Sequence, residues 1–164
     1  MAAFRMYGMA RQWAQDVLLL RMENLEIPEA PGGKGLSGAW QAVFVSPQLG
    51  QQREYSFSAV ESQAIRLRSG VFAQQPVPYT PNPQMKPFLI AALKVDSTAA
   101  YEAAVKESAE YLRKHPGLPV QFELSFTGQT PNAAWRVAWG PSVSRSDYSI
   151  YIDASTGLFM RRSR

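Results

Sequence analysis

Two similar stretches of sequence decide the fold: Ala39-Trp40-Gln41-Ala42-Val43-Phe44 and Ala134-Trp135-Arg136-Val137-Ala138-Trp139. Each has the pattern of a strand with one buried face, and each begins a series of landmarks in the same order. A tyrosine follows the first tryptophan after 15 residues in one copy (Tyr55) and after 13 in the other (Tyr148), and a Gly-x-Phe sequence closes both. Self-similarity of this kind marks an internal repeat, so we predict a duplicated chain.

The repeat makes predictions about the aromatic core. Trp40 corresponds to Trp135, and Phe44 to Trp139. These tryptophans could form a platform for a ligand or for bases, but their spacing along strands favours packing, since each buried indole removes about 200 Å² from water. We therefore expect the tryptophans to lie in the core.

Composition sets limits on the class of protein. The 164 residues are 46% apolar and 18% charged, with a net charge of +4 and no cysteine. These values indicate a globular protein without disulfides, a thiolate nucleophile or cysteine-bound metal. The apolar run Val17 to Leu20 is too short for a membrane span or a signal peptide. The chain as written carries no targeting signal, which makes the cytoplasm the default compartment; a leader or anchor removed earlier would make the protein extracytoplasmic.

Proline and glycine divide the chain into three parts. Residues 1–72 are predicted to form a first helix-plus-sheet module, with a helix over residues 2–15 and a loop at 28–38 that holds four glycines and two prolines. Residues 73–88 carry five prolines and are predicted to form an extended linker. Its Pro78-Tyr79-Thr80-Pro81 sequence is interpreted as part of a spacer rather than as a recognition ligand.

Residues 89–164 are predicted to form a second helix-plus-sheet module. Asp96 or Ser97 can cap a helix that ends before Pro116-Gly117, and alternating sequences after it indicate strands. The predicted fold is α+β, with two similar modules, each one helix packed on an antiparallel sheet of three or four strands.

The second module resembles the PepSY domain of bacterial proteins. The resemblance covers residues 89–160 and is carried by Leu93-Lys94-Val95-Asp96-Ser97, by Ala134-Trp135-Arg136-Val137 and by Ile152-Asp153-Ala154-Ser155-Thr156-Gly157. The first module matches through the repeat alone and lacks the Asp-Ala-x-Thr-Gly turn. The resemblance implies a PepSY/cystatin-like fold, a location outside the cytoplasm, and binding or regulation by protein contact. It supplies no catalytic residue.

No group of residues points to catalysis, a metal or a cofactor. His115 is the only histidine and is expected to stabilise a helix end; a triad with Ser146 and Asp147 would require long-range proximity. Asp147 and Asp153 could act as a carboxylate pair, but both fall at turns, where aspartate binds backbone amides. The run at 32–35 (Gly-Gly-Lys-Gly) lacks the pattern of a phosphate-binding loop.

We therefore predict a non-catalytic protein-binding or assembly module, in one version a peripheral subunit of a larger membrane-associated complex. The predicted partner-binding residues are Tyr79, Tyr148, Tyr151, Arg161 and Arg162, and a sheet face, a strand edge or the linker is the expected means of contact. Peripheral membrane association is compatible with the C-terminal arginines, whereas a membrane span is not expected.

Three alternatives stay open. The resemblance suggests a peptidase regulator, which would slow secreted bacterial peptidases. An enzyme of another class would need a pocket with at least two titratable groups of shifted pKa. Nucleic-acid binding through Arg66, Arg68 and the C-terminal arginines is disfavoured because no nucleic-acid-binding fold is recognisable.

Overall fold

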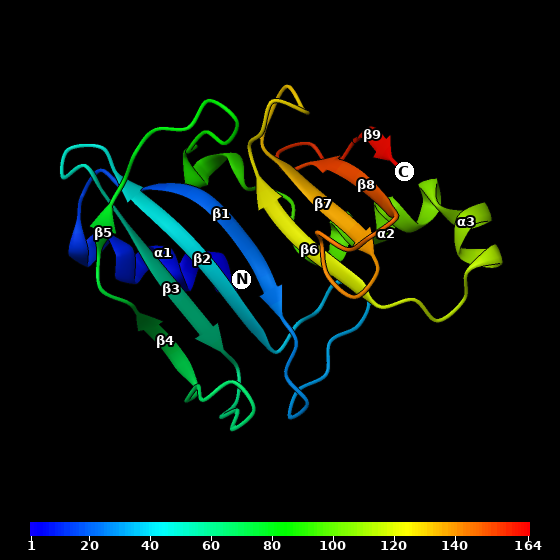
Figure 1. Cartoon of the computed structure of the whole chain (residues 1–164), viewed down its shortest axis with the longest axis horizontal. Coiled ribbons are helices and arrows are strands. Elements are labelled where there is room, and N and C mark those ends of the chain that lie inside the picture. Colours follow the sequence, from blue (N-terminus) through cyan, green and yellow to red (C-terminus); the bar gives the residue numbers. More distant parts are fainter.

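The computed structural model describes residues 1–164 and shows one large antiparallel sheet with helices on one face (Figure 1). The strand order is β4-β3-β2-β1-β6-β7-β8-β9, and the short β5 pairs with β3. The elements are α1 (Ala2–Trp13), β1 (Leu18–Leu25), β2 (Ala39–Ser46), β3 (Gln51–Ser58), β4 (Gly70–Ala73), β5 (Val77–Pro78), a 3-10 turn (Ile90–Ala92), α2 (Ser97–Glu107), α3 (Ala109–Lys114), β6 (Val120–Ser125), β7 (Ala134–Trp139), β8 (Tyr148–Asp153) and β9 (Phe159–Ser163). The predicted α+β class is confirmed.

The sheet runs through both halves of the chain without a break. β1 pairs antiparallel with β6, with Arg21 opposite Ser125 and Glu23 opposite Glu123. The expectation of a separate sheet in each module is therefore wrong. An unpaired strand edge exposes a row of backbone donors and acceptors, and joining β1 to β6 satisfies one edge of each half.

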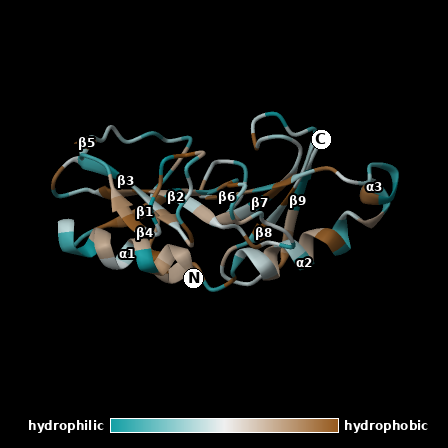
Figure 2. Ribbon diagram, turned by 90° about the horizontal axis from the view of Figure 1, so that it is seen from below, coloured by the Kyte–Doolittle hydropathy of each residue, from teal (hydrophilic) through white to brown (hydrophobic).

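Helices α1 and α2 lie on the same face of the sheet, below it in Figure 2. Small residues on their buried faces, Ala3 and Ala10 in α1 and Ala100 and Ala104 in α2, let the helix backbones approach the strands closely. The residues of this core include Trp40, Trp135 and Trp139, so the prediction that the tryptophans are buried is confirmed.

The tyrosine landmarks do not occupy equivalent positions. Tyr55 lies opposite Ala42, two residues after Trp40, whereas Tyr148 lies opposite Trp139, four residues after Trp135. The register equivalent of Tyr55 is Ile150, which faces Val137. Matching Tyr55 to Tyr148 by their order along the chain was therefore wrong. The β7–β8 turn is longer than the β2–β3 turn, and β7 and β8 are shorter than β2 and β3, so equal order along the chain does not give equal register.

The proline-rich segment is hydrogen-bonded to both halves. Val77 pairs with Gln52 of β3, and Phe88 exchanges two backbone hydrogen bonds with Leu19, each 2.9 Å long. The N–H of Lys86 also donates to the carbonyl of Phe126 at 2.8 Å. The segment therefore follows one end of the sheet instead of hanging free.

The long helix predicted in the second half is interrupted. Asp96 caps α2 by accepting a hydrogen bond from the N–H of Ala99, as expected of an N-cap. The helix then breaks at buried Ser108, with φ −117° and ψ 6°, and resumes as α3. No helix of the chain is both long and apolar enough to cross a bilayer.

Candidate binding site at the junction of the two halves

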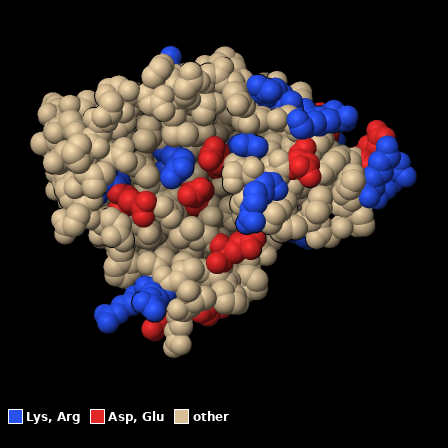
Figure 3. All heavy atoms as spheres, in the orientation of Figure 1, with Lys and Arg blue, Asp and Glu red and all other residues tan.

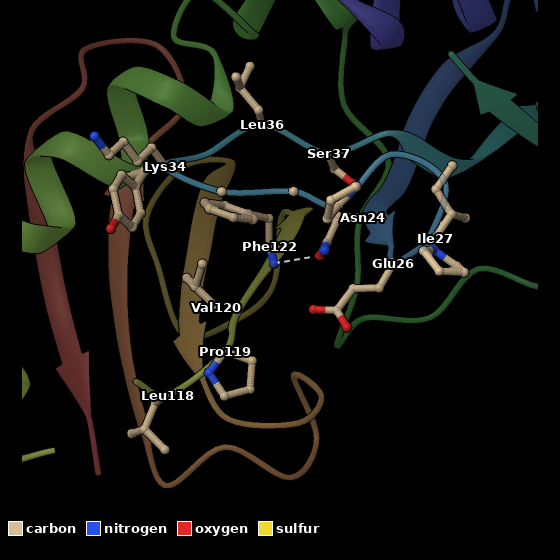
Figure 4. Close-up of a pocket in the computed structure, with 15 residues that line it drawn as sticks. Asn24, Glu26, Ile27, Lys34, Leu36, Ser37, Leu118, Pro119, Val120 and Phe122 are labelled. Carbon is tan, nitrogen blue, oxygen red and sulfur yellow. Dashed lines mark hydrogen bonds between the residues drawn. The ribbon is translucent and has the colours of Figure 1, made fainter. Parts of the chain in front are cut away.

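A cavity opens where β1 and β6 separate (Figure 4). Its volume is about 650 Å³, compared with about 470 Å³ for the cavity at the α2–α3 break. We call it the junction cavity, and its lining comes from the end of β1, the 26–38 loop, α2 and the start of β6. These residues are Asn24, Glu26, Ile27, Pro28, Pro31, Gly32, Gly33, Lys34, Leu36, Ser37, Tyr101, Leu118, Pro119, Val120 and Phe122.

A chain of amide and carboxylate groups forms one wall of the cavity. Beyond the Glu23–Glu123 pair the backbone ladder stops, and the Asn24 side chain takes its place by accepting the N–H of Phe122 at 2.8 Å. Asn24 Nδ2 donates to Gln121 Oε1 at 3.1 Å, and Gln121 Nε2 donates to Glu26 Oε1 at 2.8 Å. The connected groups hold the Glu26 carboxylate in a fixed place at the cavity.

Apolar and aromatic side chains line the cavity next to this wall. Phe122 and Val120 lie along it in Figure 4, and Tyr101 of α2 packs against Phe122 with ring centroids 6.4 Å apart. Two leucines remain open to solvent at the cavity, Leu36 at 67% and Leu118 at 39% exposure. Large exposed apolar groups beside a concave aromatic surface are typical of an interaction site.

A tight turn in the 26–38 loop completes the cavity. Gly33 and Leu36 exchange two backbone hydrogen bonds of 3.0 Å, and the two residues between them, Lys34 and Gly35, have φ of 52° and 87°. Positive φ at both central positions is the pattern of a type I′ turn. Gly35 packs against the first turn of α2, where a Cβ would lie 2.5 Å from the carbonyl oxygen of Ser97. The loop is thereby anchored across the junction.

Two oppositely charged residues line the cavity, and neither has an ion-pair partner. Glu26 and Lys34 are both exposed, and Figure 4 places them on different sides of the cavity. The ion pairs of the structure are Arg21–Glu23 and Lys114–Glu110, neither of which involves these residues. Both charges are therefore free to pair with a ligand.

Comparison with known proteins gives no relative. No protein-family model, curated protein or solved structure matches this chain. The site must therefore be interpreted from its own geometry.

None of the five residues predicted to bind a partner lines the junction cavity. Tyr148 is 2% exposed and stacks on Tyr111 of α3 with ring centroids 3.9 Å apart. The N–H of Tyr79 donates to the carbonyl of Gly50, and its side chain is half-buried. Arg162 donates from Nη2 to the carbonyl of Glu107 at 2.7 Å, which satisfies an acceptor at the end of α2. Tyr148 and Arg162 line the cavity at the α2–α3 break instead, and their partner-binding role stays a prediction.

Tyr151 lies between the core residues Ile150 and Ile152 of β8, so it is on the face of the sheet away from the helices. Acidic and basic side chains are interspersed over the face of the molecule that Figure 3 shows. A row of paired residues crosses this face from Glu23 through Glu123, Arg136 and Tyr151 to Arg161. The guanidinium groups of Arg136 and Arg161 lie 5.8 and 5.5 Å from the Tyr151 ring, on which they pack. Burial raises the pKa of Tyr151, and the residue is only 7% exposed. Little of Tyr151 is therefore open to a partner, and its partner-binding role stays a prediction.

His115, Ser146 and Asp153 have structural contacts, whereas Asp147 is exposed and accepts no hydrogen bond. His115 packs against Tyr111 with ring centroids 4.4 Å apart and, together with Asp147, lines the cavity at the α2–α3 break, but no hydrogen bond joins His115 to Asp147. Ser146 Oγ donates to the carbonyl of Val143. Asp153 accepts the backbone N–H groups of Ser155 and Thr156 at 2.8 and 2.9 Å.

Sequence reasoning missed the junction cavity because its lining comes from three separate segments. One signal was present in the sequence. The Gly33-Lys34-Gly35 stretch places glycines around a lysine in a loop, a composition that suits a tight turn with positive φ.

Proposed function

We propose that this protein is a non-catalytic protein-binding module and that the junction cavity is its binding site. The observation that carries the proposal is the pair of solvent-exposed leucines, Leu36 and Leu118, beside a cavity lined by Phe122 and Tyr101. An apolar side chain of a partner would enter the cavity, and the residues next to it would cover the two leucines. Buried anchors of this kind supply most of the affinity of protein interfaces.

The two ends of the sheet are less suited to pairing with a partner strand. β4 has only four residues. β9 has a register shift between the residues paired with Tyr151 and with Ile152, and it also carries two charged residues, Arg161 and Arg162. Short length, an irregularity and charge are devices that protect an edge from pairing. These features favour the cavity over β-strand addition as the means of binding.

The symmetry of the sheet supports the view that the two halves are related modules. The order β4-β3-β2-β1 is mirrored by β9-β8-β7-β6, and each set has a helix on the same face. In this proposal both halves are PepSY-like. Binding at their junction is consistent with the protein-contact role that the PepSY resemblance implies.

A matched pair of glycine substitutions tests the site. A Cβ on Gly33 meets no atom within 4 Å, so Gly33→Trp would place a ring in the cavity; Gly128, in a distant loop, is equally unhindered. Peptides selected on the natural protein from a displayed random library should bind Gly33→Trp at least tenfold more weakly and Gly128→Trp unchanged. Equal binding to all three proteins would refute the proposed site.

A further inference from the structure

We infer that the junction cavity binds an extended segment of a partner protein in which an apolar residue lies between a basic and an acidic residue. The basic side chain pairs with Glu26, and the acidic side chain pairs with Lys34. This inference rests on the proposed function and adds the chemistry and order of the bound segment.

The Glu26 carboxylate is prepared for a cation. Its Oε1 atom accepts one hydrogen bond from Gln121 Nε2, while its Oε2 atom has no protein donor. Gln121 is buried and is held in turn by Asn24, so the carboxylate is fixed from behind. A carboxylate with one oxygen fixed and the other free suits a guanidinium or ammonium group of a ligand.

Lys34 is held in a strained conformation next to the cavity. Its φ of 52° lies in the left-handed region, which a lysine adopts at a cost that glycine would avoid. Glycines occupy positions 32, 33 and 35 around it, yet a lysine stands at this one. Strained residues collect at functional sites, and the ammonium group of Lys34 has no protein acceptor. Lys34 is therefore suited to hold a carboxylate of the ligand.

The positions of the two charges set the order of the segment. Glu26 and Lys34 lie on different sides of the cavity, with Phe122 and Val120 between them in Figure 4. A segment that spans the cavity meets the Glu26 carboxylate, then the apolar surface, and reaches Lys34 at the opposite rim, where the ammonium group is turned outward in Figure 4. At about 650 Å³ the cavity is within the range of pockets that hold drug-sized ligands, so only a few residues can be bound.

Free peptide ends are a different source of the same charges. A free amino terminus could replace the basic side chain, and a free carboxylate could replace the acidic one. The probes are therefore displayed within a loop of a carrier protein, which leaves only side-chain charges. Selection of charged residues in this format identifies an internal segment as the ligand.

Peptide selection on the natural protein and on four charge variants tests the inference. On the natural protein, clones that depend on the open cavity should be enriched in basic and acidic residues flanking an apolar one. Glu26→Gln should lose the basic enrichment alone and Lys34→Gln the acidic enrichment alone, with affinities falling by about two- to fivefold, the range of an exposed ion pair. Glu61→Gln and Lys94→Gln, which change exposed charges outside the cavity, are the matched controls.

The outcomes separate this inference from the proposed function. Two results would overturn the charge order but leave the binding site standing. In the first, clones that fail to bind Gly33→Trp show no preference for charged residues. In the second, clones selected on Glu26→Gln and Lys34→Gln show the same charge preference as those selected on the natural protein. Clones that bind Gly33→Trp as well as the natural protein would overturn both.

Discussion

Trp40 and Trp135 meet edge to face across the junction of the two halves, with ring centroids 5.9 Å apart and planes inclined at 68°. Each comes from the second strand of its half, and Phe122 contacts both. The contact joins the two helix-covered regions into one core. The indoles differ in one respect, because Trp135 Nε1 donates to the carbonyl of Val95 at 2.8 Å whereas the indole N–H of Trp40 forms no hydrogen bond.

This difference predicts unequal effects of two substitutions. Trp135→Phe should lower the free energy of unfolding by on the order of 2–4 kcal/mol, since it removes buried volume and a hydrogen bond. Trp40→Phe should cost about 1–2 kcal/mol, since it removes volume alone. Urea denaturation followed by circular dichroism measures both values. A larger loss in Trp40→Phe would contradict the role given to the Val95 hydrogen bond.

Gly35 is predicted to be the least replaceable residue of the 26–38 loop. Gly35→Ala should lower the free energy of unfolding by more than about 2 kcal/mol, because φ is 87° and the added Cβ would lie 2.5 Å from the Ser97 carbonyl oxygen. Gly33→Ala is the matched control and should change stability by less than about 1 kcal/mol, because a Cβ there meets nothing within 4 Å. Equal values for both variants would show that the loop is not anchored on α2.

Two buried serines should respond in opposite ways to alanine substitution. Ser46 Oγ donates to Asp16 at 2.6 Å and accepts the N–H of Leu49, so Ser46→Ala should cost about 1–3 kcal/mol. Ser108 Oγ is buried without a partner at the break between α2 and α3. Ser108→Ala should be neutral or stabilising, since alanine removes an unsatisfied group and favours helix. A loss above about 1 kcal/mol in Ser108→Ala would reveal a partner for the hydroxyl.

Local patterns predicted the local structure well. The apolar spacing near the N-terminus predicted α1, Asp96 was correctly included as a cap of α2, and alternation over residues 120–126 predicted β6. The break at Ser108 was missed because the apolar face continues through it to Tyr111 and Leu112. A helix periodicity reports which face is buried, and it does not report whether the backbone stays continuous.

Long-range features were less accessible from sequence. The pairing of β1 with β6 joins residues about one hundred positions apart, and nothing in either strand specifies the other. The junction cavity depends on that pairing. Tyr148 and Tyr151 were expected on the surface because tyrosine is common in interfaces, but neighbouring rings and guanidinium groups cover them.

Asp153 is predicted to make the fold sensitive to acid. Burial acts to raise the pKa of Asp153, but hydrogen bonds from the Asn132 side chain and from the backbone of Thr156 and Ser155 outweigh it, and the pKa falls below its ordinary value of 3.8. The unfolded chain therefore binds a proton at higher pH than the folded chain. The stability that Asp153 contributes is fully present above about pH 5 and is lost as the pH falls through 3.8 toward the lower folded-state pKa.

Urea denaturation of the natural protein and of Asp153→Asn at pH 7, 5 and 3 measures this contribution. The natural protein should lose stability between pH 5 and 3, and Asp153→Asn should be less stable at pH 7 but lose less over that interval, because its side chain does not ionise. Asp147→Asn, which replaces a carboxylate that accepts no hydrogen bond, is the matched control and should leave the stability at pH 7 unchanged. Asp16 keeps some acid sensitivity in every variant, because hydrogen bonds from Ser46 and the Gln48 N–H lower its pKa as well. An unchanged loss in Asp153→Asn would mean that the hydrogen bonds at the β8–β9 turn do not stabilise the ionised carboxylate.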